Sequence, residues 1–295
     1  MRRIHLTAVL LAAAALARPA AAQDTIPAAP ADTIVLKPAP DSATGPRVCA
    51  GGDVTLGTNL DTTWVFTASA RLGRRVPALP SPDSLLAPLK PLLSDADVVL
   101  LNVESAIGAG PPARQKCAPG STSCFAFRAP TAAAEALRRV ADSAQVVGNV
   151  ANNHAKDAGV PGWYTTMRHL EAAGVHVTGG DTIPTVVETA EGDTVAVLGY
   201  SPWTGPDPRR LAEVRRVVRR AAERYPFVVV SMHMGAEGRG AVRTPNATEI
   251  AFGEDRGNSV AFAHAAIDAG ADVVFGHGPH VVRAAEWYGD GLIFY

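Results

Sequence analysis

The sequence predicts an α/β fold with a central sheet, and three observations support this prediction. Short apolar runs rich in Val, Leu and Ala alternate along the chain with longer segments of helical periodicity. Gly174 and Gly270 follow two of the helical segments, as glycine commonly does just past a helix end. Polar residues follow the apolar runs, and ligands gather at the carboxyl ends of strands in such folds. We therefore expect helices packed outside a largely central sheet.

The expected elements alternate from residue 47 to the end of the chain. The strands are expected at 47–51, 98–103, 145–150, 175–179, 194–198, 227–231, 272–275 and 291–295. The helices are expected at 84–93, 131–141, 162–173, 208–224 and 259–269. Pro88 and Pro91 interrupt the first helix, and Thr131 is the candidate N-cap of the second. The strongly basic helix at 208–224 is most simply interpreted as the solvated face of an amphipathic segment.

Residues 1–22 have the pattern of a secretory signal sequence. Arg2 and Arg3 precede an apolar run, 6–16, that is too short to span a bilayer, and small residues at 20–22 offer a cleavage site. A transmembrane anchor is the alternative interpretation. Residues 23–46 are rich in Ala, Pro, Asp and Thr, which predicts a linker. We expect an exported protein, periplasmic or extracellular, with one domain at 47–295.

The charge and the cysteines restrict the function further. The formal net charge of -1 gives no indication of nucleic acid as a partner. Cys117 and Cys124 flank a segment of turn-forming residues, and in an oxidising compartment we expect a disulfide between them. Two free thiols are the alternative. Cys49 begins an apolar run and is interpreted as a small core residue.

His277 and His280 leave the end of a predicted strand together, at a turn that begins with Gly276. Imidazole is the commonest nitrogen ligand for Zn, Mn and Fe, so the pair predicts a metal site. A polar turn that happens to contain two histidines is the alternative. Four upstream strands are also followed by potential ligands or polar partners, and these residues are Asp53, Asn102, Glu104, Asn152, Asn153, His154, His233 and Glu237.

This mixture of oxygen and nitrogen donors suits divalent ions such as Mn, Zn or Fe. The set exceeds what one tetrahedral ion needs, and two ions that share a carboxylate would use all of it. We therefore expect one or two divalent ions. Paired ions are a familiar arrangement for clamping a phosphoryl group during in-line attack.

The order of the motifs is similar to that of the CapA family of poly-γ-glutamate capsule synthesis proteins, within the calcineurin-like metallophosphoesterase superfamily. The matching segments are Gly52–Gly57, Asn102–Glu104, Ala151–Gly159, His233–Glu237, Ala266–Asp272 and Gly276–Val281. The resemblance implies a four-layer α-β-β-α metallophosphoesterase-like sandwich, with the site at one edge of the two sheets.

The resemblance also implies a role for each candidate ligand. Asp53 and His280 correspond to ligands of a first metal, and Glu104 corresponds to the bridging acid. Asn153, His233 and His277 correspond to ligands of a second metal. His154 corresponds to the acid beside the leaving group.

The chain departs from the family pattern at several positions. Thr55 stands where the superfamily has a histidine, which would weaken the first metal site. Gly278 stands where members often have a second histidine, and Ser105 where they commonly have glycine. Members continue beyond Tyr295 with a Ser-Leu-Gly-Asn-Phe-like segment, so we expect either a sequence truncated at its C-terminus or a shortened domain that lacks a strand of the sheet.

Each candidate also has a simpler interpretation. Asp53 would cap a turn, Glu104 would lie in a surface turn, and Asn152 would only orient its neighbours. Asp157 would hold His154 in place or cap the following turn. Glu237 and Arg239 would meet substrate or lie in an exposed loop. His169, His176 and His264 have no partners in the pattern and are interpreted as structural.

Two functions follow from these observations. The first is an exported protein of capsule or cell-envelope polymer biosynthesis with a metal-dependent phosphoester hydrolase site, in which His154 protonates the leaving oxygen. The second is a non-hydrolytic accessory protein that binds or guides an anionic polymer such as poly-γ-glutamate. Expected partners are a phosphoester substrate or an anionic envelope polymer, and membrane-bound capsule synthesis machinery. The ligand set favours the first function, and Thr55 favours the second.

Overall fold

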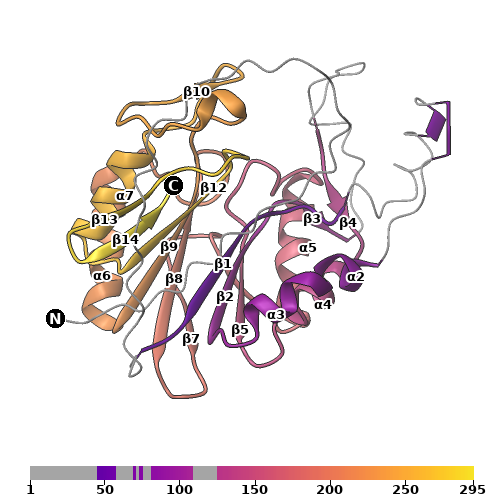
Figure 1. The fold of residues 1–295 in the computed structure, drawn as a ribbon, viewed down its shortest axis with the longest axis horizontal. Coiled ribbons are helices and arrows are strands. Elements are labelled where there is room, and N and C mark those ends of the chain that lie inside the picture. Colours follow the sequence, from indigo (N-terminus) through magenta and orange to yellow (C-terminus); the bar gives the residue numbers. More distant parts are fainter. Residues whose placement is uncertain (1–44, 58–68, 71–72, 76–80, 109–124) are drawn as a thin grey trace, which may run out of the picture.

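Two sheets organise the computed structural model, which describes residues 45–57, 69–70, 73–75, 81–108 and 125–295 (Figure 1). The prediction of an α/β fold is confirmed. The predicted signal sequence, nearly all of the linker, and both Cys117 and Cys124 lie outside the described residues. No helix within these ranges has both the length and the apolarity that a membrane span requires.

The first sheet has four parallel strands in the order β1-β2-β5-β6. They are β1 (Val48–Val54), β2 (Val98–Val103), β5 (Gln145–Asn149) and β6 (His176–Thr178). All residues of β2 are buried, as expected for a parallel strand covered on both faces. The pairing of β1 with β2 shifts register between Gly51 and Asp53. Such a bulge re-aims side chains, and here it places Asp53 opposite Asn102.

The second sheet has six strands in the order β13-β14-β12-β9-β8-β7. They are β7 (Thr185–Glu188), β8 (Thr194–Tyr200), β9 (Phe227–His233), β12 (Val273–His277), β13 (Ala285–Tyr288) and β14 (Gly291–Phe294). The inner strands β8, β9, β12 and β14 run parallel, whereas the edge strands β7 and β13 are antiparallel to their neighbours. Neither edge strand was predicted from the sequence. Two short strand pairs form separate two-stranded sheets: β3 (Ala106–Ile107) with β4 (Arg128–Ala129), and β10 (Ile250–Ala251) with β11 (Glu254–Asp255).

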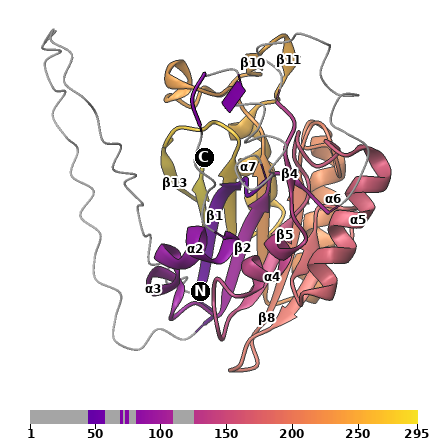
Figure 2. The ribbon, with the colours of Figure 1, turned by 90° about the vertical axis from the view of Figure 1, so that its right-hand side faces the viewer.

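The helices pack on both sheets (Figure 2). They are α2 (Pro82–Leu86), η1 (Ala87–Leu89), α3 (Lys90–Leu93), α4 (Ala132–Arg138), α5 (Gly159–Ala172), α6 (Leu211–Arg224), η3 (Arg239–Ala241) and α7 (Ser259–Asp268). Prolines divide the first predicted helix into α2, η1 and α3. Thr131 occupies the N-cap position of α4 but makes no capping hydrogen bond, because its backbone is already helical. Asn258 caps α7 by accepting from the amide of Ala261.

Three apolar clusters hold these layers together. One lies between the first sheet and helices α2 to α5, and another lies between the second sheet and helices α6 and α7. The third lies between the sheets, where Val98 and Leu100 of β2 join Val229 of β9 and Val273 of β12 in one cluster. Each such buried side chain stabilises the fold by roughly 1.5–3 kcal/mol. The packing aligns the two sheets so that the carboxyl ends of β1, β2, β9 and β12 meet at one edge.

Candidate metal centre

Five of the six side chains predicted as metal ligands contact one another at this edge, and the sixth belongs to His277. The β1, β9 and β12 strands run further than the sequence predicted, so Asp53, His233 and His277 lie within strands and not beyond them. The backbones of His233 and His277 are paired across β9 and β12. Glu104 follows β2 directly, whereas Asn153 and His280 come from loops.

Asp53, Glu104 and His280 form the most compact group, with one potential ligand atom from each lying within 4.8 Å of the others. His280 Nε2 lies 3.5 Å from Asp53 Oδ2 and 4.0 Å from Glu104 Oε2. These are the residues that the family resemblance implies for the first metal, with Glu104 as the bridging acid. The side chain of His280 is half exposed, and its backbone has a φ of +54°, which is uncommon for a residue other than glycine.

His233 connects this group to the second set of ligands. Its Nε2 lies 2.9 Å from Asn153 Oδ1 and 3.7 Å from Glu104 Oε1. Its Nδ1 lies 3.3 Å from Asp53 Oδ1 and 2.9 Å from the amide nitrogen of Asn102. Contacts at both ring nitrogens fix the orientation of this buried imidazole.

His277 is the member of the site whose polar atoms are least satisfied. It is buried, and neither of its ring nitrogens has a hydrogen-bond partner among the described residues. Burial lowers the pKa of His277 to about 4, with the charge of Asp53 opposing the shift and that of His233 adding to it. The imidazole is therefore neutral at pH 7 and has a lone pair available. A buried polar group without a partner destabilises a protein by roughly 1–3 kcal/mol, and a divalent ion would supply that partner.

Asp53 is held ionised by its neighbours. Burial alone would raise the pKa of its carboxyl, but the hydrogen bond and charge of His233, the charge of His277 and the Asn102 amide hold that pKa well below its usual range. Its Oδ1 accepts from Asn102 at 2.6 Å, and its Oδ2 accepts from the backbone amide of Gly278 at 3.0 Å. A carboxylate that stays charged while largely buried is suited to bind a cation.

Buried asparagines form a layer beneath the ligands. The Asn102 side-chain oxygen accepts from the amides of both Asn149 and Asn152, at 3.0 and 3.2 Å. The Asn152 oxygen accepts from the backbone of His154 at 3.1 Å. The structure therefore places Asn102 and Asn152 where they orient ligands. Asn149 ends β5 opposite Asn102 and was missed, although an asparagine directly after an apolar run was a signal for it.

His154 and Asp157 form a separate pair beside the carboxylates. His154 Nδ1 lies 2.6 Å from Asp157 Oδ2, which also accepts from the backbone of Phe127 at 2.6 Å. The Phe127 ring covers the imidazole at a centroid distance of 4.3 Å. His154 Nε2 lies 3.9 Å from Glu104 Oε1, so it faces the carboxylates. An acidic partner on Nδ1 leaves Nε2 as the position where a proton is exchanged.

Aromatic and charged residues from loops that follow strands of the second sheet and of the β10-β11 pair border the site. The Trp203 ring meets the His233 ring edge-on at a centroid distance of 5.7 Å. The buried Arg256 guanidinium lies over the Trp203 ring and donates to Glu237 at 2.9 Å. Glu237 Oε2 is 3.9 Å from His280 Nδ1. Trp203 and Arg256 were not predicted, because both lie in loops without a motif.

Gly278 takes part in the site through its backbone. Its φ is +104°, and a Cβ built there would lie 3.3 Å from the His233 ring. We expect Gly278→Ala to destabilise the protein by about 1–3 kcal/mol and to weaken metal binding, because the new methyl group presses on a candidate ligand. Thermal unfolding and metal titration measure the two effects.

Gly192→Ala is the matched control. Gly192 has a φ of +86° and nothing within 4 Å of the position that a methyl group would take, so the substitution imposes the backbone strain without the contact. Equal metal affinities in the two variants would contradict a role for the space beside His233.

The remaining sequence candidates lie away from this group. Thr55 is exposed and makes no described contact with the ligands. His264 lies within 3.1 Å of Glu286 and stacks on Tyr288, and His176 lies within 3.1 Å of Gln145. The imidazole of His169 lies next to Gly108.

Comparison with known proteins supplies the family. The family model described as "Bacterial capsule synthesis protein PGA_cap" matches residues 47–295. The chain is 28% identical over 181 residues to the capsule biosynthesis protein CapA of Bacillus anthracis, over 55% of this chain and 41% of that protein. It is 29% identical over 181 residues to the PGA biosynthesis protein CapA of Bacillus subtilis strain 168, over 55% of this chain and 43% of that protein. The matched region thus spans less than half the length of either curated relative. The match across residues 47–295 shows that this chain belongs to the bacterial capsule synthesis protein PGA_cap family.

Proposed function

We propose that this protein acts in capsule or cell-envelope polymer biosynthesis as a metal-dependent phosphoester hydrolase. The observation that carries the proposal is the buried imidazole of His277, which lacks hydrogen-bond partners among the described residues. His277 pairs with His233 across β9 and β12, and His233 contacts both Asp53 and Glu104 of the compact group formed with His280. Packing alone gives no reason for that arrangement. The family membership supports the biological context.

The donor set fits divalent ions such as Mn, Zn or Fe. Asp53, Glu104 and His280 would hold one ion. Asn153, His233 and His277 would hold a second ion, with Glu104 shared between the two. Ions bound there would act as Lewis acids on the phosphoryl oxygens and on water.

The proposed chemistry of the chain itself is proton transfer by His154. Asp157 accepts from Nδ1 and fixes the ring, so Nε2 faces the carboxylates and would carry the proton given to the leaving oxygen. The Phe127 ring shields the pair on one side, which strengthens its electrostatic interaction.

Three finer parts of the proposal concern the rest of the chain. The three apolar clusters support a four-layer sandwich of the metallophosphoesterase type. The pattern of residues 1–22 supports export, and the spacing of Cys117 and Cys124 supports a disulfide. The intact mass of the exported protein, before and after alkylation without reduction, tests the signal cleavage and the disulfide.

A second candidate function is favoured by the exposed Thr55 and by the half-exposed His280. Without a histidine at position 55, the first metal has only three protein ligands, and one of them is open to solvent. A protein that keeps the fold and holds only one metal would act as a non-hydrolytic accessory that binds an anionic polymer.

Metal analysis and an aryl-phosphate assay distinguish the two functions. We expect one tightly bound and one weakly bound divalent ion in the purified protein, with slow hydrolysis that rises when Mn or Zn is added, because Thr55 leaves the first site short of a ligand. Two tightly bound ions would show that another residue replaces the missing histidine. No hydrolysis at saturating metal would exclude the hydrolase function and leave the accessory function.

A further inference from the structure

A buried ion pair lies beside the candidate metal centre, outside its group of ligands. Arg283 follows His280 by three residues, and its side chain is completely buried against that of Glu249, which is 5% exposed. Arginine is almost never fully buried unless it is paired, and a pair of this kind calls for a physical reason.

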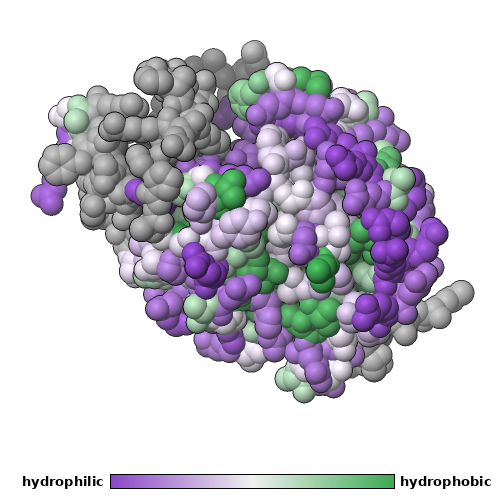
Figure 3. Space-filling view, turned by 180° about the vertical axis from the view of Figure 1, so that it is seen from behind, coloured by the Kyte–Doolittle hydropathy of each residue, from purple (hydrophilic) through white to green (hydrophobic). Residues whose placement is uncertain are grey.

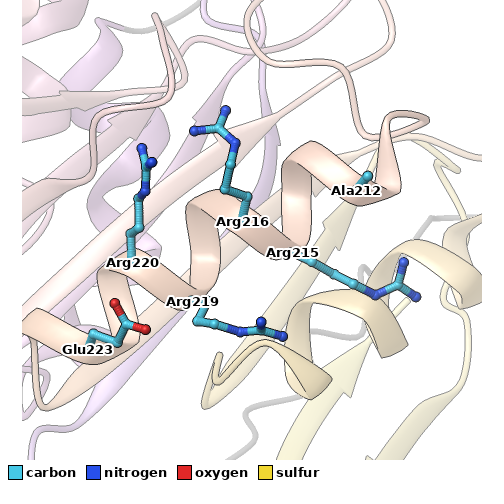
Figure 4. Close-up of a pocket in the computed structure, with 6 residues that line it drawn as sticks. All are labelled: Ala212, Arg215, Arg216, Arg219, Arg220 and Glu223. Carbon is cyan, nitrogen blue, oxygen red and sulfur yellow. The ribbon is translucent and has the colours of Figure 1, made fainter.

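The arginines of α6 show the ordinary surroundings of this residue type. Arg215, Arg216, Arg219 and Arg220 are exposed, extend away from the helix and line a surface cavity of about 520 Å³ (Figure 4). Seen from behind, the surface along the right-hand edge of the molecule, where α6 runs, is strongly hydrophilic (Figure 3). Water solvates these four guanidinium groups, whereas Arg283 has exchanged water for protein partners.

Protein acceptors surround the Arg283 guanidinium. Its two terminal nitrogens donate to the two carboxylate oxygens of Glu249 at 2.9 and 2.7 Å, which is the bidentate arrangement. Its Nε donates to the backbone oxygen of Ala241 at 2.8 Å, and a terminal nitrogen donates to that of Ala236 at 2.9 Å. Glu249 also accepts from the backbone amide of Ala236 at 3.2 Å. The ion pair is therefore bonded to the backbone at two positions of the segment that follows His233.

Stability alone is a weak explanation for this pair. Moving two charges out of water carries a desolvation cost that their attraction only partly offsets, and replacing a buried pair by apolar side chains is often neutral. Apolar side chains do not supply direction, whereas bidentate hydrogen bonds fix how two segments of backbone lie relative to each other. The segments that the pair joins therefore indicate its role.

Gly235, two residues after the candidate ligand His233, packs directly against the ion pair. A Cβ built at this glycine would lie 3.0 Å from a guanidinium nitrogen of Arg283 and 3.1 Å from a carboxylate oxygen of Glu249. The backbone of Gly235 has a φ of +91°, which favours glycine. The chain that leaves β9 thus passes in contact with both members of the pair.

His280 is tied to this same segment on both of its sides. Before it, the backbone oxygen of Pro279 accepts from the amide of Gly238 at 2.9 Å. After it, Arg283 donates to two backbone oxygens of residues 236–241. The loop that carries His280 is thereby fixed against the segment that follows β9.

His280 depends on these contacts more than the other candidate histidines do. Its φ of +54° is unfavourable for a residue other than glycine and persists only where the surrounding structure imposes it. Its side chain is half exposed, so apolar packing contributes little to its position. His233 and His277 are instead buried and paired across β9 and β12. Loss of the ion pair should therefore displace His280 and leave His233 and His277 in place.

We propose that Arg283 is a positioning residue of the candidate metal centre, which acts through His280 and, paired with Glu249, sets the affinity of the first metal. Asp53, Glu104 and His280 are the proposed protein ligands of that metal, so displacement of one of the three weakens it more than the second metal. The inference rests on the proposed function for the presence of the ions, and it deepens that function by naming what controls occupancy of the first site.

Titration of the full chain with Mn²⁺, followed by the electron paramagnetic resonance signal of the free ion, tests the inference. The double variant R283M/E249M replaces both members of the pair by unbranched apolar side chains, so neither charge is left buried alone. We expect the weak first site of this variant to bind Mn²⁺ about 10-fold less tightly than in the wild type, with the tight site unchanged. Arg283→Lys keeps the charge without the bidentate geometry and should give an intermediate loss.

Hydrogen exchange in the presence of a chelator gives a second measurement that does not depend on metal. The backbone amides of residues 278–284 should exchange faster in R283M/E249M than in the wild type, whereas those of β9 and β12 should not change. The unchanged strands also show that the variant is folded.

The double variant R139M/D83M is the matched control. Arg139 and Asp83 form a bidentate pair of the same kind on the surface, at 2.8 and 3.0 Å. Removal of this pair should leave both Mn²⁺ affinities at their wild-type values. A first-site loss equal to that of R283M/E249M would assign the effect to charge removal and overturn the inference.

Combination with His280→Ala shows whether Arg283 acts through His280. If it does, R283M/E249M/H280A should bind Mn²⁺ as H280A alone does, whereas a further loss would overturn the inference. Equal weakening of both sites in R283M/E249M would also overturn it, because the pair would then support the fold in general. An unchanged first site in that variant would overturn the inference and leave the proposed metal centre standing. A wild type that binds no Mn²⁺ would instead overturn the proposed function, on which the inference rests.

Discussion

Replacing His277 by Ala is expected to lower the affinity for divalent metal by about 100-fold or more, since even partners of metal ligands typically contribute 10–100-fold. His277 is the buried residue with no other described partner for either ring nitrogen, and its low pKa keeps it neutral at pH 7. At a metal concentration 100 times the dissociation constant, the wild type should gain about 2.7 kcal/mol of stability, and the variant almost none. Metal analysis and thermal unfolding with and without chelator measure both effects.

Two further variants separate ligation from folding. His264→Ala removes an imidazole that contacts Glu286 and Tyr288 and should leave metal content unchanged. His277→Leu fills the same space with an apolar group, so the metal-free protein should be at least as stable as the wild type. If His277→Leu instead unfolds in chelator while wild type stays folded, the ring has a structural partner and the ligand assignment is wrong.

Replacing His154 by Ala should reduce hydrolysis by about 10²–10⁴-fold while leaving metal content unchanged, because its proposed role is proton transfer. Its Nε2 lies 3.9 Å from Glu104 Oε1, and its Nδ1 is occupied by Asp157. The aryl-phosphate assay at saturating metal, together with metal analysis, measures the two quantities on the same samples.

Asp157→Asn provides the matched comparison for the His154 pair. An amide at this position keeps the shape but removes the charge that fixes the ring tautomer, so we expect a smaller loss of about 10-fold. An ester with a good leaving group needs less protonation and should narrow the difference between His154→Ala and wild type. Loss of metal from His154→Ala would instead make His154 a ligand.

The alternation of apolar runs and helical segments was enough to predict the α/β fold and most inner strands. The edge strands β7 and β13 were missed because each is half exposed and lacks a continuous apolar run. Strand ends were placed too early, since Asp53, His233 and His277 are polar but still pair within the sheets. A polar residue near the end of an apolar run thus indicates a candidate site more reliably than it indicates where the strand stops pairing.

Site residues that belong to sequence motifs could be predicted. Residues that join the site only through tertiary contacts could not. The backbone amide of Gly278 donates to Asp53 across 225 positions of sequence, and no local pattern indicates such a contact. Arg256 becomes part of the site because it stacks on Trp203 and pairs with Glu237. The roles of these residues depend on tertiary packing, which a motif does not encode.

The candidate centre is shared between two sheets that are joined mainly by apolar packing, with hydrogen bonds from Thr178 of β6 to Val197 of β8 and from Thr185 of β7 to Val177 of β6. Asp53 belongs to one sheet and His233 to the other, and the atoms of both that face each other are 3.3 Å apart. If one sheet slid over the other by even a fraction of that distance, the distances between the candidate ligands would therefore change. The valine-rich layer between the sheets therefore keeps the candidate ligands of one sheet aligned with those of the other. Changes of volume there, far from any ligand, should tune metal selectivity as well as stability.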